Sequence, residues 1–117
     1  MIKNFRDLQV WQKGMNVVVE IYSITGDSAF SRDVGLRDQL RRSSVSIPSN
    51  IAEGFERKSK AEFRRFIAIA LGSAAELFTQ IEISQRIGCL SQEKGDAVEQ
   101  HLDEIAKMLQ SLKQKTF

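Results

Sequence analysis

The chain has 117 residues, with 17 basic and 15 acidic side chains and a net charge of +2. This length suffices for about one domain, and so small a net charge is no argument by itself for a nucleic-acid or membrane partner. One proline and seven glycines leave little material for a turn-rich β fold. We therefore expect residues 1–117 to form a single all-α domain.

The N-terminal residues and the cysteine content predict a cytoplasmic protein. Lys3, Arg6 and Asp7 stand where a secretory signal would need an apolar core, and Cys89 has no second cysteine with which to form an internal disulfide. Charged or amide side chains interrupt every apolar run before it reaches the ~20 residues that cross a bilayer. We expect no membrane-spanning segment.

The first helix is expected over residues 5–25, with Gly26 as a left-handed stop. One apolar stripe repeats at steps of three and four residues, as a helix face requires. It consists of Leu8, Trp11, Met15, Val18 and Tyr22. A second stripe beside it consists of Val10, Val17, Ile21 and Ile24. Together they cover more of the circumference than one core face uses, so the second stripe is expected to face another partner.

The next helix is expected from Leu36 to Phe55, with Pro48 in its middle. Proline removes one backbone hydrogen bond and presses on the preceding turn, at a cost of about 3 kcal/mol in an undistorted helix. The sequence therefore predicts a kink at Pro48. The hydroxyls of Ser43 and Ser44 are placed to satisfy the freed carbonyl groups.

Two further helices follow. Ser59 and Glu62 have the spacing of a capping box, which starts the third helix, and Gly88 is its expected stop. Its core line is Phe63, Phe66, Ile67, Ala70, Ala74, Leu77 and Ile81, while Ile69, Ile83 and Ile87 project elsewhere. Ser91 is the expected N-cap of the last helix. Its apolar seam is Val98, Leu102, Ile105, Leu109 and Leu112. Short connections make neighbouring helices antiparallel, which predicts an up-down-up-down four-helix bundle.

No catalytic chemistry is expected. His101 is the one histidine, so neither a di-iron bundle site nor a histidine-rich zinc site can be assembled. The glycines are dispersed and form no phosphate-binding loop. We predict no catalytic residue, no metal, no cofactor and no small-molecule substrate.

The region from Arg41 to Arg65 concentrates positive charge. Its seven basic residues, against three acidic ones, are Arg41, Arg42, Arg57, Lys58, Lys60, Arg64 and Arg65. A basic patch at the turn between the second and third helices is a candidate nucleic-acid-binding site, whose affinity would fall as salt rises. The alternative is a solvated helical hairpin, in which Asp38 pairs with Arg41 or Arg42 and Glu62 pairs with Arg65.

A polar stripe lies beside Ile47 and Ile51 on the second helix. Its members are Ser46, Ser49, Asn50 and Glu53. One interpretation is structural: the stripe forms hydrogen bonds inside the bundle, and Gly54 allows close helix contact. The other is a polar groove, flanked by Arg41 and Arg42, where a phosphate or a partner segment docks.

Four segments together resemble a known family. They are FRDLQVWQ at residues 5–12, QLRR at 39–42, SIPSNIAEG at 46–54 and EFRRF at 62–66. The pattern is similar to the four-helix-bundle proteins encoded in intervening sequences of bacterial 23S ribosomal RNA genes. The resemblance covers nearly the whole chain, with departures at Phe78 and Cys89, where relatives often have glutamate and tyrosine.

The resemblance implies a ring-like homo-oligomer, typically a pentamer, without catalytic residues. It also implies distant kinship to accessory bundle proteins of diversity-generating retroelements, which bind nucleic acid and a reverse transcriptase. The leading hypothesis is a non-enzymatic homo-oligomeric scaffold, for which the surplus apolar stripes give a physical motive. The alternative is an RNA- or DNA-binding accessory protein that uses the basic patch.

Overall fold

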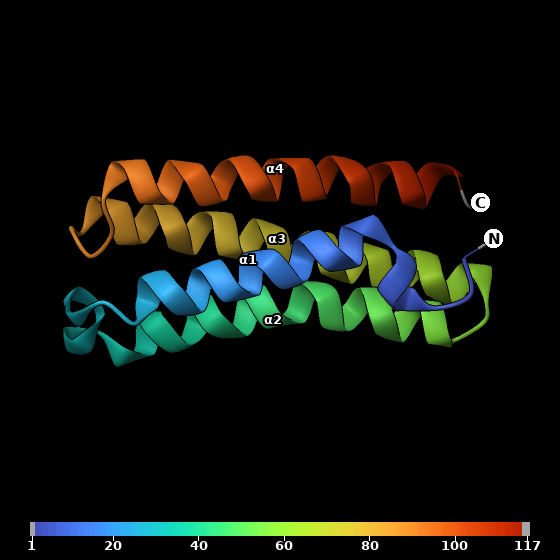
Figure 1. Cartoon of the computed structure of the whole chain (residues 1–117), viewed down its shortest axis with the longest axis horizontal. Coiled ribbons are helices and arrows are strands. Elements are labelled where there is room, and N and C mark those ends of the chain that lie inside the picture. The colour runs from blue at the N-terminus through green and yellow to red at the C-terminus, as the bar shows by residue number, and fades with distance from the viewer. Residues whose placement is uncertain (1, 116–117) are drawn as a thin grey trace.

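A computed structural model describes residues 2–115, and within this range the chain is all-helical. The elements in chain order are η1 (Phe5–Asp7), α1 (Gln9–Thr25), η2 (Ser28–Arg32), α2 (Val34–Glu56), α3 (Lys60–Arg86) and α4 (Gln92–Lys115). The long helices pack side by side in an elongated body of 44 × 20 × 20 Å, and consecutive ones run in opposite directions (Figure 1). Each helix contacts its neighbours in the chain, and α1 closes the bundle against α4. The predicted four-helix bundle is confirmed.

Side-chain caps begin most of the helices. Asp33 accepts a hydrogen bond from the Leu36 N–H at 3.0 Å, and the Ser59 hydroxyl accepts one from the Glu62 N–H at 3.3 Å. Ser91 caps α4 by accepting from the Lys94 N–H at 3.2 Å. These bonds satisfy N–H groups that have no partner within the helix.

Two glycines were expected to end helices in the left-handed conformation. Gly88 does so, with φ of 84°. Gly26 does not: its φ of −76° and ψ of −10° are right-handed. Its N–H bonds to the carbonyls of Tyr22 and Ser23, so the last turn of α1 continues through it into the loop. The first prediction is confirmed and the second is wrong.

The orientation of α1 differs from the expectation, and its start does too. A short 3₁₀ turn, η1, covers residues 5–7, so the α-helix begins at Gln9. The stripe expected to be surplus is the buried one: Val10, Gly14, Val17, Ile21 and Thr25 are buried. Gly14 lies on this buried face beside Pro48 of α2, at a distance where a Cβ would make an ordinary contact of 3.5 Å with the Pro48 ring. A glycine has no hydrophobic weight in a periodicity count, so the apolar pattern of α1 gives no sign that Gly14 is buried against α2.

The stripe expected to face the core is instead on the outside of α1. Met15 and Tyr22 are 40% and 45% exposed, and Leu8, Trp11 and Val18 are partly buried.

Helix α2 passes through Pro48 without ending. Pro48 is buried and packs beside Gly14, and the hydroxyl of Ser44 donates to the Arg41 carbonyl at 2.8 Å. The expected kink stays a prediction. At the other end of α2, a Cβ added to Gly54 would lie 2.7 Å from the Phe66 Cβ, which confirms that this glycine allows α2 and α3 to approach closely.

The core lines predicted on α3 and α4 are confirmed. Along α3 the buried hydrophobic residues are Phe66, Ile67, Ala70, Ala74, Leu77 and Ile81, and Phe63 at the start of the line is partly buried. Along α4 they are Val98, Leu102, Ile105 and Leu109, with Leu112 partly buried. Cys89 and Phe78 pack against the edge of this core, and Cys89 is a free thiol.

Helix α3 is the longest helix in the described residues, and it contains an apolar stretch. It is 27 residues long with a mean hydropathy of 1.4 in its most apolar window, so by length and composition it is a candidate membrane span. This differs from the sequence-based expectation. Core helices of bundles meet the same criterion, and the buried residues of α3 recur at helical spacing against α2 and α4.

Candidate functional site

The seven basic residues predicted as one patch lie at two distant places. Arg41 is separated from Arg57 by 16 positions of continuous helix, which is about 24 Å along α2. Arg41 is also occupied within the bundle, because its Nε donates to the Thr25 hydroxyl at 2.9 Å and its guanidinium lies 4.5 Å over the Tyr22 ring. Arg41 and the neighbouring Arg42 therefore do not belong to the patch at the α2–α3 turn.

Acidic residues neutralise part of the remaining patch. Arg57 bridges Glu53 at 3.0 Å and Glu62 at 3.4 Å, and Arg65 bonds Glu62 at 2.9 Å. The hydrogen bond from Arg65 lowers the pKa of Glu62, with the charge of Arg57 adding to the effect. Glu62 in turn raises the pKa of Arg65. The predicted pairing of Glu62 with Arg65 is confirmed.

The other predicted pair is wrong. Asp38 contacts Arg37 at 3.3 Å, where Arg41 or Arg42 was expected. The reason is that Arg41 turns toward α1 and stacks on Tyr22.

The polar stripe of α2 is largely used inside the bundle. Ser46 Oγ lies 2.8 Å from Ser73 Oγ of α3, and Asn50 Nδ2 donates to the Ser46 carbonyl and hydroxyl at 2.7 and 2.9 Å. Glu53 belongs to the arginine network, and Ser49 is exposed. This arrangement supports the structural interpretation for Ser46 and Asn50, since Ser46 joins α2 to α3 and Asn50 holds the Ser46 hydroxyl from the same helix.

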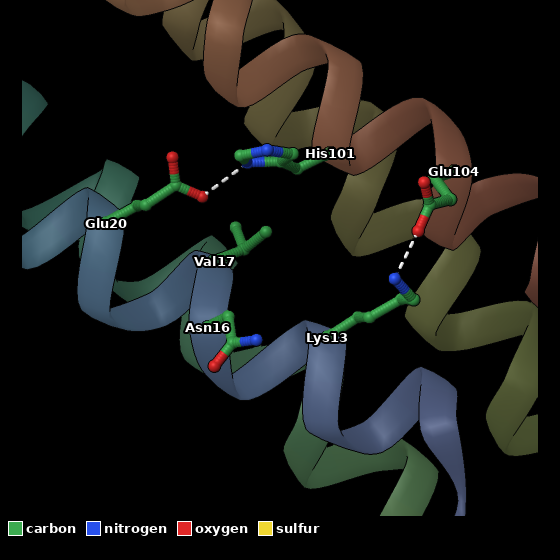
Figure 2. A pocket seen from close by; sticks show the side chains of 6 residues that line it. All are labelled: Lys13, Asn16, Val17, Glu20, His101 and Glu104. Atoms are coloured by element: carbon green, nitrogen blue, oxygen red, sulfur yellow. Dashed lines mark hydrogen bonds and ion pairs between the residues drawn. The ribbon is translucent and has the colours of Figure 1, made fainter.

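A cavity that the sequence did not indicate lies between α1 and α4. It has a volume of about 180 Å³, and Figure 2 shows the two interhelical contacts that border it. His101 Nδ1 lies 2.7 Å from Glu20 Oε1, and Lys13 pairs with Glu104. The hydrogen bond from Lys13 lowers the pKa of Glu104. These partners are far apart in the chain, so periodicity within one helix gives no signal for them.

Two carboxylates meet on the opposite side of α4. Glu99 faces Glu82 of α3, and its Oε2 atom is buried without a hydrogen-bond donor among the described residues. Burial raises the pKa of Glu99 to about 7, and the hydrogen bond and charge of Glu82 add to the shift. A proton on Glu99 would supply the missing donor between the two carboxyl groups.

Two separate apolar surfaces are exposed. The first, here the α1–α2 face, is made of Met15, Val18, Val19 and Tyr22 on α1 and Val45 on α2. Val45 lies one turn from Arg41, which contacts Tyr22, so the two helices share this surface. Ile69, Ile83 and Ile87 are 39%, 44% and 56% exposed, as predicted. Ile69 lies 14 positions, or about 21 Å of helix, before Ile83. The second surface, here the α3 face, is therefore made of Ile83 and Ile87 at the C-terminal end of α3.

Within residues 2–115, no group of three or more histidine, cysteine or acidic side chains is arranged to hold a metal ion. The features at the surface are helix faces, ion-pair networks and open cavities. They define an all-helical bundle protein with exposed apolar and charged surfaces.

Residues 6–111 match the family described as 23S rRNA-intervening sequence protein, and the chain belongs to this family. A similar solved structure is the 1.70 Å crystal structure of a protein with unknown function from the S23 ribosomal protein family of Bacteroides thetaiotaomicron VPI-5482. The two share 26% sequence identity and a TM-score of 0.80, over 90% of this chain and 98% of that one. No curated protein matches the chain.

Proposed function

We propose that the protein is a non-enzymatic scaffold that assembles with copies of itself, most simply as a closed ring of five subunits in the cytoplasm. The observation that carries the proposal is the pair of apolar surfaces that the bundle leaves uncovered. Val19, within α1, is 68% exposed, and Ile87, directly after α3, is 56% exposed. Exposed apolar surface that recurs at helical spacing is typical of contact sites.

The two faces favour a ring over a simple dimer. The α1–α2 face carries an aromatic ring and an arginine, whereas the α3 face carries two isoleucines. If one face packs on the other, each subunit uses two different surfaces, and such a head-to-tail contact closes into a ring when the rotation permits. The number five comes from the family resemblance stated above.

Light scattering at micromolar concentration tests the assembly. We expect a mass several times the 13.3 kDa of a single chain. A Val19→Glu variant should lower that mass, because it places a charge in the apolar contact. Gln100→Glu is the control, since it adds the same charge at an exposed position of α4, away from both apolar faces. A monomeric wild-type protein would overturn the proposal.

The second candidate function is binding of RNA or DNA at the α2–α3 turn. Lys58 and Lys60 are exposed there, beyond the arginine and glutamate network. In a ring, several copies of this turn would add their weak affinities for one polyanion. Titration with a structured RNA at several salt concentrations tests it: the affinity should fall with salt, and less steeply for a variant with Lys58→Gln and Lys60→Gln. An undetectable or salt-insensitive interaction would exclude it.

A further inference from the structure

A wide cavity opens at the end of the bundle where α2 turns into α3. Its volume is about 400 Å³, within the range of binding pockets. The start of the chain and the last turns of α4 lie at this same end (Figure 1). Its apolar wall is formed by Ile2, Leu8, Phe55, Phe63 and Leu112. Lys58, Ser59 and Lys60 complete the lining, and we call this the corner cavity.

The apolar wall of the corner cavity favours an apolar ligand group. Most of the lining surface is carbon, and Ile2 is 46% exposed at its edge. Against this carbon-rich wall, a nucleobase would find few partners for the donors and acceptors on its edges. An aliphatic or aromatic side chain carries no such groups and gains by leaving water.

The lysines at the mouth of the corner cavity, Lys58 and Lys60, favour a negatively charged ligand. Arg57 and Arg65 already pair with Glu53 and Glu62. No carboxylate of the described residues comes within ion-pairing distance of Lys58 or Lys60, and both side chains are exposed. The corner cavity thus combines an apolar wall with two uncompensated ammonium groups.

Lys58 is held at a backbone cost. Its φ of 58° lies in the left-handed region, where glycine is the favoured residue after a helix end. Its ammonium group lies 5.0 Å from the centroid of the Phe55 ring, a part of the cavity wall. Local strain of this kind concentrates at binding sites, and here it holds a cation at the mouth of the cavity.

We propose that the corner cavity binds an acidic peptide segment of a partner protein. One aliphatic or aromatic side chain enters the cavity, and carboxylates on either side of it pair with Lys58 and Lys60. This inference goes beyond self-assembly and does not depend on the number of subunits.

The probes are three fluorescein-labelled peptides of eight residues, each with a central leucine, phenylalanine or tryptophan between glutamates. Fluorescence anisotropy with the full chain should show saturable binding of at least one of them up to millimolar protein. Lys58→Gln together with Lys60→Gln should weaken it about tenfold. Lys107→Gln, a change at an exposed position of α4, should leave it unchanged.

Two variants separate binding from folding. Lys58→Gly relieves the backbone and should raise the melting temperature while weakening the peptide, a combination that a purely structural lysine would not give. Ile2→Ser removes part of the apolar wall at a half-exposed position and should weaken the peptide without loss of fold.

Four results would overturn the proposal. They are no binding of any of the three peptides, equal binding when serine replaces the central side chain, displacement by a single-stranded oligonucleotide that binds the same lysines more tightly, or peptide binding only by a chain shortened after Lys115. The last would show that residues 116 and 117 occupy the cavity themselves.

Discussion

Lys58 has the one positive φ angle among the described non-glycine residues, 58°, at the junction of α2 and α3. An L-residue in this conformation costs about 1–2 kcal/mol, because its Cβ approaches the backbone. We predict that Lys58→Gly raises the free energy of unfolding by about 1 kcal/mol, measured by urea denaturation. Lys60→Gly is the control: it lies in the first turn of α3, where glycine should be neutral or destabilising. A destabilised Lys58→Gly variant would show that the lysine side chain contributes more than the backbone loses.

Gly54 and Gly72 offer a matched pair of helix glycines. A Cβ at Gly54 would lie 2.7 Å from the Phe66 Cβ, whereas a Cβ at Gly72 meets nothing within 4 Å. Gly54→Ala should destabilise the protein by about 1–3 kcal/mol, since α2 and α3 must move apart. Gly72→Ala should stabilise it by about 0.5–1 kcal/mol through helix propensity alone. Equal effects of the two changes in urea denaturation would contradict the close packing of α2 on α3.

At the scale of the elements, the contact between α3 and α4 should depend on pH. The pKa of Glu99 is raised from 4.5 to about 7, chiefly by burial. Between these two values the unfolded chain releases a proton that the folded chain keeps, so the free energy of unfolding falls as pH rises and levels off above about 7.

Glu99→Gln removes this dependence. We predict that the variant is more stable than the wild type at pH 8 by about 1 kcal/mol, a figure reduced for the partial exposure of the site, and equally stable near pH 4. Glu82→Gln should act in the same direction, because it removes the facing carboxylate. Denaturant unfolding at several pH values measures both. A wild type that gains stability relative to Glu99→Gln with rising pH would exclude the shared proton.

Periodicity predicted the elements better than it predicted how they face one another. The buried lines of α3 and α4 follow from apolar spacing alone, because large side chains mark them. The reversed face of α1 does not, because it depends on how α1 meets α2, where Gly14 lies beside Pro48. For the candidate site, Glu62 with Arg65 was predictable from helical spacing, whereas Glu20 with His101 depends on how α1 and α4 meet. A contact within one helix can be predicted from the sequence of that helix, whereas a contact between two helices depends on how both are oriented.

At the scale of the whole molecule, the two exposed apolar faces lie on different helices. A bundle 20 Å wide cannot cover them with its own side chains, since each helix already has two neighbours. In the proposed assembly, one copy's α1–α2 face meets the next copy's α3 face. Two variants, each altered on a different face, should therefore behave differently when mixed than they would if the contact were a symmetric dimer.

Val19→Glu blocks the α1–α2 face, and Ile83→Glu blocks the α3 face; both residues are exposed, so the fold should persist. Each variant alone should be monomeric by light scattering, because head-to-tail contact needs both faces. Mixed in equal amounts, they keep one intact face of each kind and should form a one-to-one dimer that grows no further. A symmetric interface made by one face alone gives the opposite pattern: the variant altered on the other face keeps its full mass by itself, and mixing restores nothing. The mixture thus distinguishes a ring-forming contact from a two-fold one before the number of subunits is known.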